Sequence, residues 1–236
     1  MFPLKDNLPT ERFPVVTVLL IVANVVVYFL LQDGGWELTS NTRGDWAVDD
    51  YAAVPCELAG ECASRGTVDD YVSVLTSMFM HGGVLHLAGN MLFLWVYGNN
   101  IEDAMGVVRF VGFYVLGGAA AMALQTAIDP GSPVPTIGAS GAVSAVLGAY
   151  LLLHPRAGIV TLSLIPFFFG VLVLPAMVVI GVWFAQQVVF GLLDFNTAGD
   201  GGGVAYFAHI GGFLFGLAVV KLLARRRRTA PAPYRL

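Results

Sequence analysis

One hydroxyl group stands where a proline-containing loop enters an apolar helix. Residues 136–142 read Thr-Ile-Gly-Ala-Ser-Gly-Ala, so Ser140 lies between Gly138 and Gly141. The prolines just upstream cannot continue a helix, so the helix should begin near Gly138. Backbone N–H groups in a first turn are unpaired, and they would stabilise the oxyanion formed when a serine attacks a carbonyl. A tightly packed helix start is the alternative, and this short motif does not decide between them.

Three of the four histidines lie in or beside apolar segments, namely His81, His86 and His209. Ionisable side chains in such segments are costly and are therefore candidates for function. His86 and Asn90 are four residues apart and share a helix face. The glycine pair at 82–83 should keep His81 in the turn before that helix.

The composition indicates a polytopic membrane protein. Hydrophobic residues make up 57% of the 236 residues and charged residues only 12%, whereas soluble domains carry about 25% charged residues. Two cysteines are too few for a disulfide scaffold or a cysteine-rich metal site.

We expect an all-α fold, a bundle of six transmembrane helices with a long first outer loop. The predicted spans are residues 14–31, 84–97, 110–128, 140–153, 176–193 and 204–223. Residues 1–13 are predicted to form a cytoplasmic N-terminal segment, and residues 224–236 a basic cytoplasmic tail. Residues 154–175 contain three prolines, which favours an interfacial segment over a seventh span.

The outer loop, residues 32–70, is acidic and contains three aromatic residues typical of a membrane interface. Its length predicts structure of its own. The loop contains Cys56 and Cys62. Outside the membrane oxidation is permitted, so we favour a disulfide between them over two free thiols.

The distribution of Lys and Arg predicts the orientation. With the N-terminus inside, ten of the twelve basic residues fall on the inner side, and only Arg43 and Arg65 fall outside. Both termini are then cytoplasmic, and the helices that begin near Ser140, His86 and His209 all run inward. At 1.5 Å per residue these groups lie within roughly 10 Å of the outer boundary. Polar residues that serve only as structural contacts would not share one depth.

Stripes of small residues predict close helix contacts. One stripe runs along the last predicted span and consists of Ala205, Ala208, His209, Gly212 and Gly216. Another runs along the Ser140 helix and consists of Gly141, Ala145 and Gly148.

Three motifs occur in order along the chain: His81-x4-His86-x3-Asn90, Gly138-Ala-Ser140-Gly141 and Ala208-His209-x2-Gly212. Together they resemble the motifs of the rhomboid intramembrane serine proteases. The resemblance extends from about residue 14 to residue 223 and includes the six-helix layout and the long first loop.

The resemblance implies roles for the polar residues. Ser140 would be the nucleophile and His209 its base, while His86 and Asn90 would help form the oxyanion hole. We group His81, Gly138 and Gly141 with the oxyanion and substrate-binding residues.

The chain departs from the family at one position. Some members carry a tyrosine under the catalytic histidine, where this chain has Ser144. The histidine must then be oriented by other contacts, such as the Ser144 hydroxyl or packing at Gly212. No carboxylate is predicted at this depth, so we expect a dyad.

The predicted activity is hydrolysis of peptide bonds in or near transmembrane segments of membrane proteins. We expect a multi-pass protein of a prokaryotic plasma membrane that contacts the lipid bilayer, with no metal, cofactor or nucleic acid. His-Glu-x-x-His is absent, which argues against a zinc protease. Two alternatives are an inactive relative that binds transmembrane segments and a six-helix transporter. The intact Ser140 and His209 argue against the first, and the absence of charges in the middle of the spans argues against the second.

Access to the site is predicted to involve the fifth span. Trp183 and Phe184 on this span would form a lateral gate that a substrate helix displaces, next to a glycine-rich loop at residues 194–203.

Overall fold

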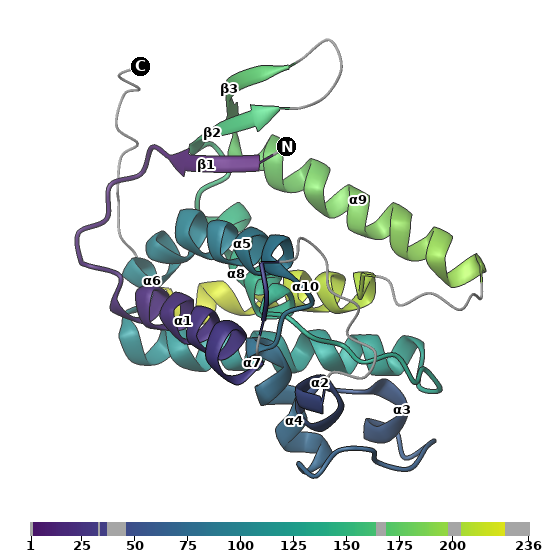
Figure 1. Ribbon diagram of the computed structural model, residues 1–236. Coiled ribbons are helices and arrows are strands. Elements are labelled where there is room, and N and C mark those ends of the chain that lie inside the picture. Colours follow the sequence, from purple (N-terminus) through teal and green to yellow (C-terminus); the bar gives the residue numbers. More distant parts are fainter. Residues whose placement is uncertain (1, 33, 37–45, 164–168, 198–203, 225–236) are drawn as a thin grey trace.

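Helices make up most of the structure, a computed structural model that describes residues 2–32, 34–36, 46–163, 169–197 and 204–224 (Figure 1). In the first half of the chain the helical elements are α1 (Val15–Val26), η1 (Val27–Leu31), α2 (Trp46–Tyr51), α3 (Pro55–Leu58), α4 (Asp70–Thr76), η2 (Ser77–Phe79), α5 (Val84–Phe93), η3 (Leu94–Gly98) and α6 (Asn99–Met105). The longer helices follow: α7 (Val107–Ile128), α8 (Ser140–Leu153), α9 (Ala176–Thr197) and α10 (Tyr206–Leu223). Residues 225–236 of the predicted basic tail and the 198–203 part of the glycine-rich loop lie outside the described residues.

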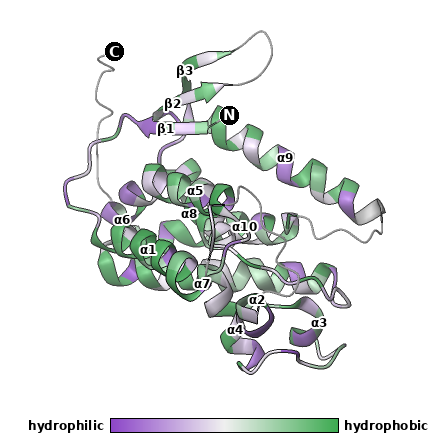
Figure 2. Ribbon diagram, viewed as in Figure 1, coloured by the Kyte–Doolittle hydropathy of each residue, from purple (hydrophilic) through white to green (hydrophobic). Residues whose placement is uncertain are grey.

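Several helices are apolar and long enough to cross a membrane. Among the described residues, α7, α9 over Ala176–Asp194, and α10 meet this condition. The bent pair Asp70–Phe79 and Val84–Met105 would be a fourth span. Val15–Leu31 and α8 are apolar but shorter. The protein is therefore a mostly helical membrane protein, while the count of six spans stays a prediction. Figure 2 shows hydrophobic residues dominating the long helices and hydrophilic residues around α2 and α3.

Helix α8 lies at the centre of the fold. Its residues from Gly141 to Tyr150 are all buried, and α10 and α7 pack along it. Three contacts place a glycine of one helix so close to the other that an added methyl group would collide with a backbone carbonyl oxygen: Gly212 on Gly141, Gly216 on Ala145, and Gly148 on Phe213. The close contact predicted from the small-residue stripes is thus confirmed.

A small antiparallel sheet corrects the all-α prediction. Strands β1 (Phe2–Asp6), β2 (Gly158–Ser163) and β3 (Gly170–Pro175) pair in the order β1-β2-β3. Phe2 lies opposite Leu162, and Gly158 lies opposite Pro175. The sheet lies on the opposite side of the helices from α2–α4 (Figure 1). The segment at 154–175 contains no helix among its described residues. Its β-branched residues suit strands, but its pairing with β1 is too distant in sequence for a local pattern to show.

Buried carboxylates hold the N-terminal segment against the helices. Asp6 accepts hydrogen bonds from the Tyr150 hydroxyl and the Asn100 amide, both at 2.6 Å. Burial raises the pKa of Asp6 to about 6, although the Tyr150 hydrogen bond acts in the opposite direction. Glu102 accepts from the backbone N–H groups of Val16 and Thr17 at 2.9 and 2.8 Å, so it caps the first turn of α1.

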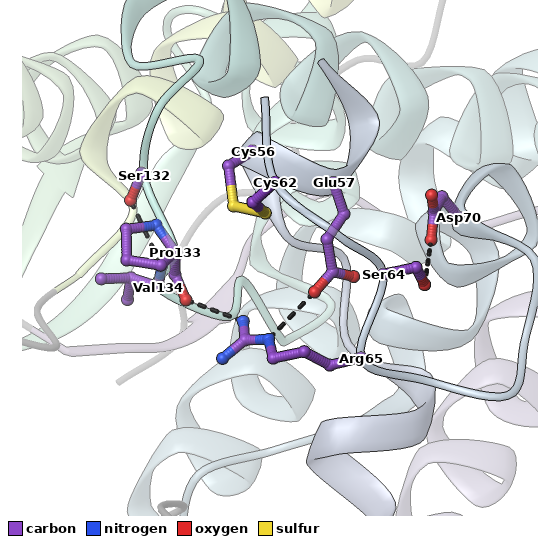
Figure 3. The surroundings of a disulfide bond; sticks show 9 residues. All are labelled: Cys56, Glu57, Cys62, Ser64, Arg65, Asp70, Ser132, Pro133 and Val134. Atoms are coloured by element: carbon purple, nitrogen blue, oxygen red, sulfur yellow. Dashed lines mark hydrogen bonds and ion pairs between the residues drawn. A yellow bond between two sulfur atoms is a disulfide. The ribbon is translucent and has the colours of Figure 1, made fainter. Parts of the chain in front are cut away.

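The acidic loop has structure of its own, as predicted, and it contacts the segment that leads to Ser140. The disulfide between Cys56 and Cys62 is present and confirms that prediction (Figure 3). Arg65 pairs with Glu57 at 3.0 Å and also donates to the carbonyl oxygen of Pro133 at 2.8 Å. Two further backbone contacts join the loop to this segment: Cys56 N–H to Ser132, and the bridge between Ala53 and Thr136.

Candidate active site

Ser140 is the first residue of α8 and follows a backbone turn that only glycine adopts readily. Gly138 has φ +117°, a backbone conformation that residues with a Cβ atom rarely adopt. Its N–H donates to the carbonyl oxygen of Ser77 at 2.9 Å. The helix has no side-chain cap at Ala139. Ser140 is therefore held at a helix start where backbone N–H groups lack partners within the helix.

His209 reaches Ser140 from the neighbouring helix α10. Its Nε2 lies 2.8 Å from Ser140 Oγ, although the two residues are 69 positions apart. Gly212, one turn further along α10, packs on the Gly141 carbonyl and allows this approach. Gln125 of α7 accepts the Ala208 N–H at 3.1 Å and fixes the start of α10. The hydroxyl and the imidazole are thus within hydrogen-bonding distance, with His209 buried and Ser140 partly buried.

Gln187 of α9 is a third member of this group, and sequence reasoning missed it. Its Oε1 lies 2.8 Å from His209 Nδ1, and the side chain is buried. The available signal was a pair of amide side chains, Gln186 and Gln187, in an otherwise apolar predicted span. The Ser144 hydroxyl, expected to help orient the histidine, donates instead to the Ser140 carbonyl oxygen at 2.6 Å.

The two aromatic residues predicted to form a gate pack against α10. The Trp183 ring centre lies 6.0 Å from that of His209 and 6.2 Å from that of Phe213. Phe184 stacks on Phe213 with ring centres 4.1 Å apart. These residues therefore hold α9 beside the histidine, and their action as a gate stays a prediction.

His86 and Asn90 of α5 lie beside the loop that precedes Ser140. A methyl group at Gly138 would lie 2.8 Å from His86 Nε2 and 3.6 Å from Asn90 Nδ2. The Gly82 N–H points at His86 Nδ1 at 3.4 Å, which leaves the proton of a neutral ring on Nε2. Asn90 Nδ2 is buried and has no hydrogen-bond partner within the described part of the chain. Both side chains thus present donors close to Gly138, two residues before Ser140.

His81 lies behind His86 and is fully buried. Gln32 holds its backbone through two hydrogen bonds, donating to the carbonyl at 2.7 Å and accepting from the N–H at 2.9 Å. The rings of His81 and His86 are 5.1 Å apart. Neither ring nitrogen of His81 has a hydrogen-bond partner among the described residues. His81 therefore supports His86 and does not reach Ser140 itself.

A recess beside Ser140 is lined mainly by small and apolar residues of η2, α7, α8 and α10. Gly118 and Ala121 line it from α7, and Ala208 lines it from α10. A small or slender side chain fits such a lining better than a charged one. Of the glycines predicted to belong to the site, Gly138 contacts His86. Gly141 packs against Ala121 of α7, and its carbonyl oxygen contacts Gly212 of α10.

Comparisons with known proteins identify the family of this chain. A family model described as the Rhomboid domain matches residues 68–226. The Bacillus subtilis protein named "Rhomboid protease GluP" is 30% identical over 138 residues, which are 58% of this chain and 24% of that protein. "Presenilin-associated rhomboid-like protein A, mitochondrial" of Danio rerio is 33% identical over 148 residues, covering 61% and 35%. The mouse protein "Presenilin-associated rhomboid-like protein, mitochondrial" is 29% identical over 149 residues, covering 61% and 36%. The matched segment therefore spans about a quarter to a third of these relatives.

Proposed function

Because this chain belongs to the rhomboid family, we propose that it is an intramembrane serine endopeptidase that uses Ser140 and His209 as a dyad. The observation that carries this proposal is the 2.8 Å separation between Ser140 Oγ and His209 Nε2. A serine becomes a useful nucleophile when a base within this distance accepts its proton.

The reaction follows from the positions of the groups. His209 Nε2 takes the Ser140 proton as Oγ attacks the carbonyl carbon of the scissile peptide bond. The protonated imidazole then gives that proton to the leaving amine, and water hydrolyses the acyl-enzyme by the same route. The products are two chains with a new carboxylate and a new amine.

Negative charge develops on the carbonyl oxygen, and three donors are proposed to stabilise it. They are the backbone N–H of Ser140, the Asn90 amide and the His86 imidazole. The unpartnered Asn90 Nδ2 supports this role because a buried donor without a partner is costly unless a ligand uses it. One such donor contributes on the order of 10²- to 10³-fold to the rate.

The substrate class is a transmembrane segment of another membrane protein. The apolar helices that carry the site support this choice, and the small-residue recess supports a small side chain next to the scissile bond. The six-span topology, with both termini cytoplasmic and the site opening outward, belongs to the same proposal.

The test is labelling with a fluorophosphonate, which forms a covalent bond with an activated serine. Purified protein should be labelled, while Ser140→Ala and His209→Ala should not. Ser144→Ala is the matched control, since it removes a hydroxyl one turn along the same helix and should retain labelling. Labelling of the Ser140→Ala protein at the wild-type rate would refute the dyad.

A further inference from the structure

The structure assigns a positioning role to Gln187: we propose that its amide selects the imidazole tautomer of His209 that can accept the Ser140 proton. This inference rests on the proposed protease function and adds a residue from α9 to the site. Gln187 is a buried amide in an apolar helix, and its partner is a nitrogen of the His209 ring.

The hydrogen bonds of Gln187 decide which end of its amide faces the histidine. Its Nε2 lies 3.2 Å from the carbonyl oxygen of Trp183, one turn earlier in α9. A carbonyl oxygen only accepts hydrogen bonds, so the NH2 group must be on that side. Oε1 therefore faces His209. Because an amide oxygen also only accepts, Nδ1 of His209 must carry a proton.

This assignment places the histidine in the tautomer that the reaction needs. A neutral imidazole with its proton on Nδ1 has a lone pair on Nε2, which faces Ser140 Oγ at 2.8 Å. The other tautomer would direct an N–H at the serine and could not accept its proton. A partner that fixes the wrong tautomer lowers kcat by about 10⁴-fold in serine proteases, so the selection matters on that scale.

An amide suits this position better than a carboxylate does. A charged side chain among apolar helices is costly, whereas an amide offers an acceptor without a charge. Both ring nitrogens of His209 are engaged, one by Ser140 and one by Gln187. Gln187 thus occupies the place at which the third group of a catalytic triad orients the base, without forming an ion pair.

The role also ties the chemistry to the position of α9. Trp183 and Phe184 pack this helix against α10 beside the same histidine. If α9 moves outward, Gln187 leaves His209 and the preference for one tautomer is lost. A substrate helix that displaces α9 must therefore let it return before the bond is cut.

The test compares Gln187→Leu, Gln187→Glu and the control Gln186→Leu in cleavage of a transmembrane peptide and in fluorophosphonate labelling. Gln186 is adjacent in sequence and exposed. We expect Gln187→Leu to lower kcat by about 10²-fold or more with KM nearly unchanged, and Gln186→Leu to behave like wild type. Gln187→Glu should restore most of the loss. It should also move the acidic limb of the pH profile to higher pH, because a carboxylate stabilises the imidazolium.

Four outcomes separate the possibilities. Wild-type kcat in Gln187→Leu would overturn the positioning role and leave the protease proposal standing. A loss that Gln187→Glu does not relieve at any pH would also overturn it, because packing alone would explain the loss. If wild-type protein neither cleaves nor takes up label, the protease proposal itself fails. Should Gln187→Leu not fold, an unchanged pH profile in Gln187→Glu is the result that overturns the inference.

Discussion

At the Leu153 end of α8, Tyr150 and Asn100 both donate to the carboxylate of Asp6, and nearby Glu102 accepts two backbone N–H groups of α1. At the Ser140 end, about 15 Å away along the helix, the amide nitrogen of Asn90 is buried without a partner among the described residues.

Asp6 and Glu102 hold the fold through these hydrogen bonds, whereas the Asn90 amide is a donor that a ligand can use. A buried carboxylate is tolerated when donors surround it, and its hydrogen bonds stabilise the folded state. A buried donor without a partner destabilises the folded state but is ready for a substrate oxygen. Substitutions at the Leu153 end should therefore affect stability, and substitutions at the Ser140 end should affect activity.

The largest effect is expected from removing the dyad. Ser140→Ala and His209→Ala should each lower the cleavage rate by at least about 10⁴-fold, and the double variant should lose little more because the two groups act as a unit. Thermal unfolding should change little in all three proteins. Independent, multiplying losses in the double variant would contradict a shared role.

A matched pair of asparagines sharpens the comparison. Asn90→Ala should lower kcat by about 10²-fold or more without destabilising the protein, since Asn90 Nδ2 has no hydrogen-bond partner to lose in the described part of the chain. Asn100→Ala should reduce the free energy of unfolding by about 1–3 kcal/mol, because it removes a donor from buried Asp6, while leaving kcat near wild type. The measurements are steady-state kinetics and denaturant unfolding. The reverse pattern would remove the distinction between the two ends.

The pH dependence of stability tests the Leu153 end alone. The pKa of Asp6 is raised from 3.8 to about 6 in the folded protein, so the folded state binds its proton more tightly than the unfolded state does. This contribution is fully present below pH 3.8 and is lost as the pH rises through about 6. The loss should be about 2–3 kcal/mol. Plots of the free energy of unfolding against pH should therefore differ in slope between wild type and Asp6→Asn over this window. Parallel plots would contradict the burial of the carboxyl group.

The smallest effect is expected at the aromatic contact between α9 and α10. Phe184→Ala removes the stacking on Phe213 and should raise cleavage of transmembrane substrates relative to a soluble peptide by a few-fold, on the order of 1 kcal/mol. Both substrates should be measured with the same preparation. An equal change for the two substrates would argue against a gate formed by α9.

Local patterns in the sequence predicted much of the site. The motifs around His86, Ser140 and His209 depend on short spacings along one helix or turn, and the structure brings these residues together. The small-residue stripes predicted the α8–α10 contact for the same reason, since a helical repeat assigns residues to one face. The disulfide followed from two cysteines six positions apart in a loop predicted to lie outside.

Other features depend on partners that no local pattern identifies. Asp6 meets Tyr150 across 144 positions, and β1 pairs with a strand more than 150 residues away. In the sequence Asp6 and β1 belong to the polar N-terminal segment, Tyr150 belongs to a predicted span, and the partner strand of β1 belongs to the proline-containing segment at residues 154–175. Only the packing of the sheet against the helices decides that Asp6 is buried. The same packing decides that β1 joins β2 and β3 as the third strand of the sheet.

Composition and spacing determined that this chain is a membrane protein with serine and histidine clusters of the rhomboid kind, because hydrophobicity and helical period are properties of short segments. Tertiary structure alone decided how the histidine is oriented. Gln187 and His209 lie on different helices, and their 2.8 Å contact depends on the angle and depth at which α9 packs on α10. That packing is the sum of many weak contacts between helices, and one sequence does not show it.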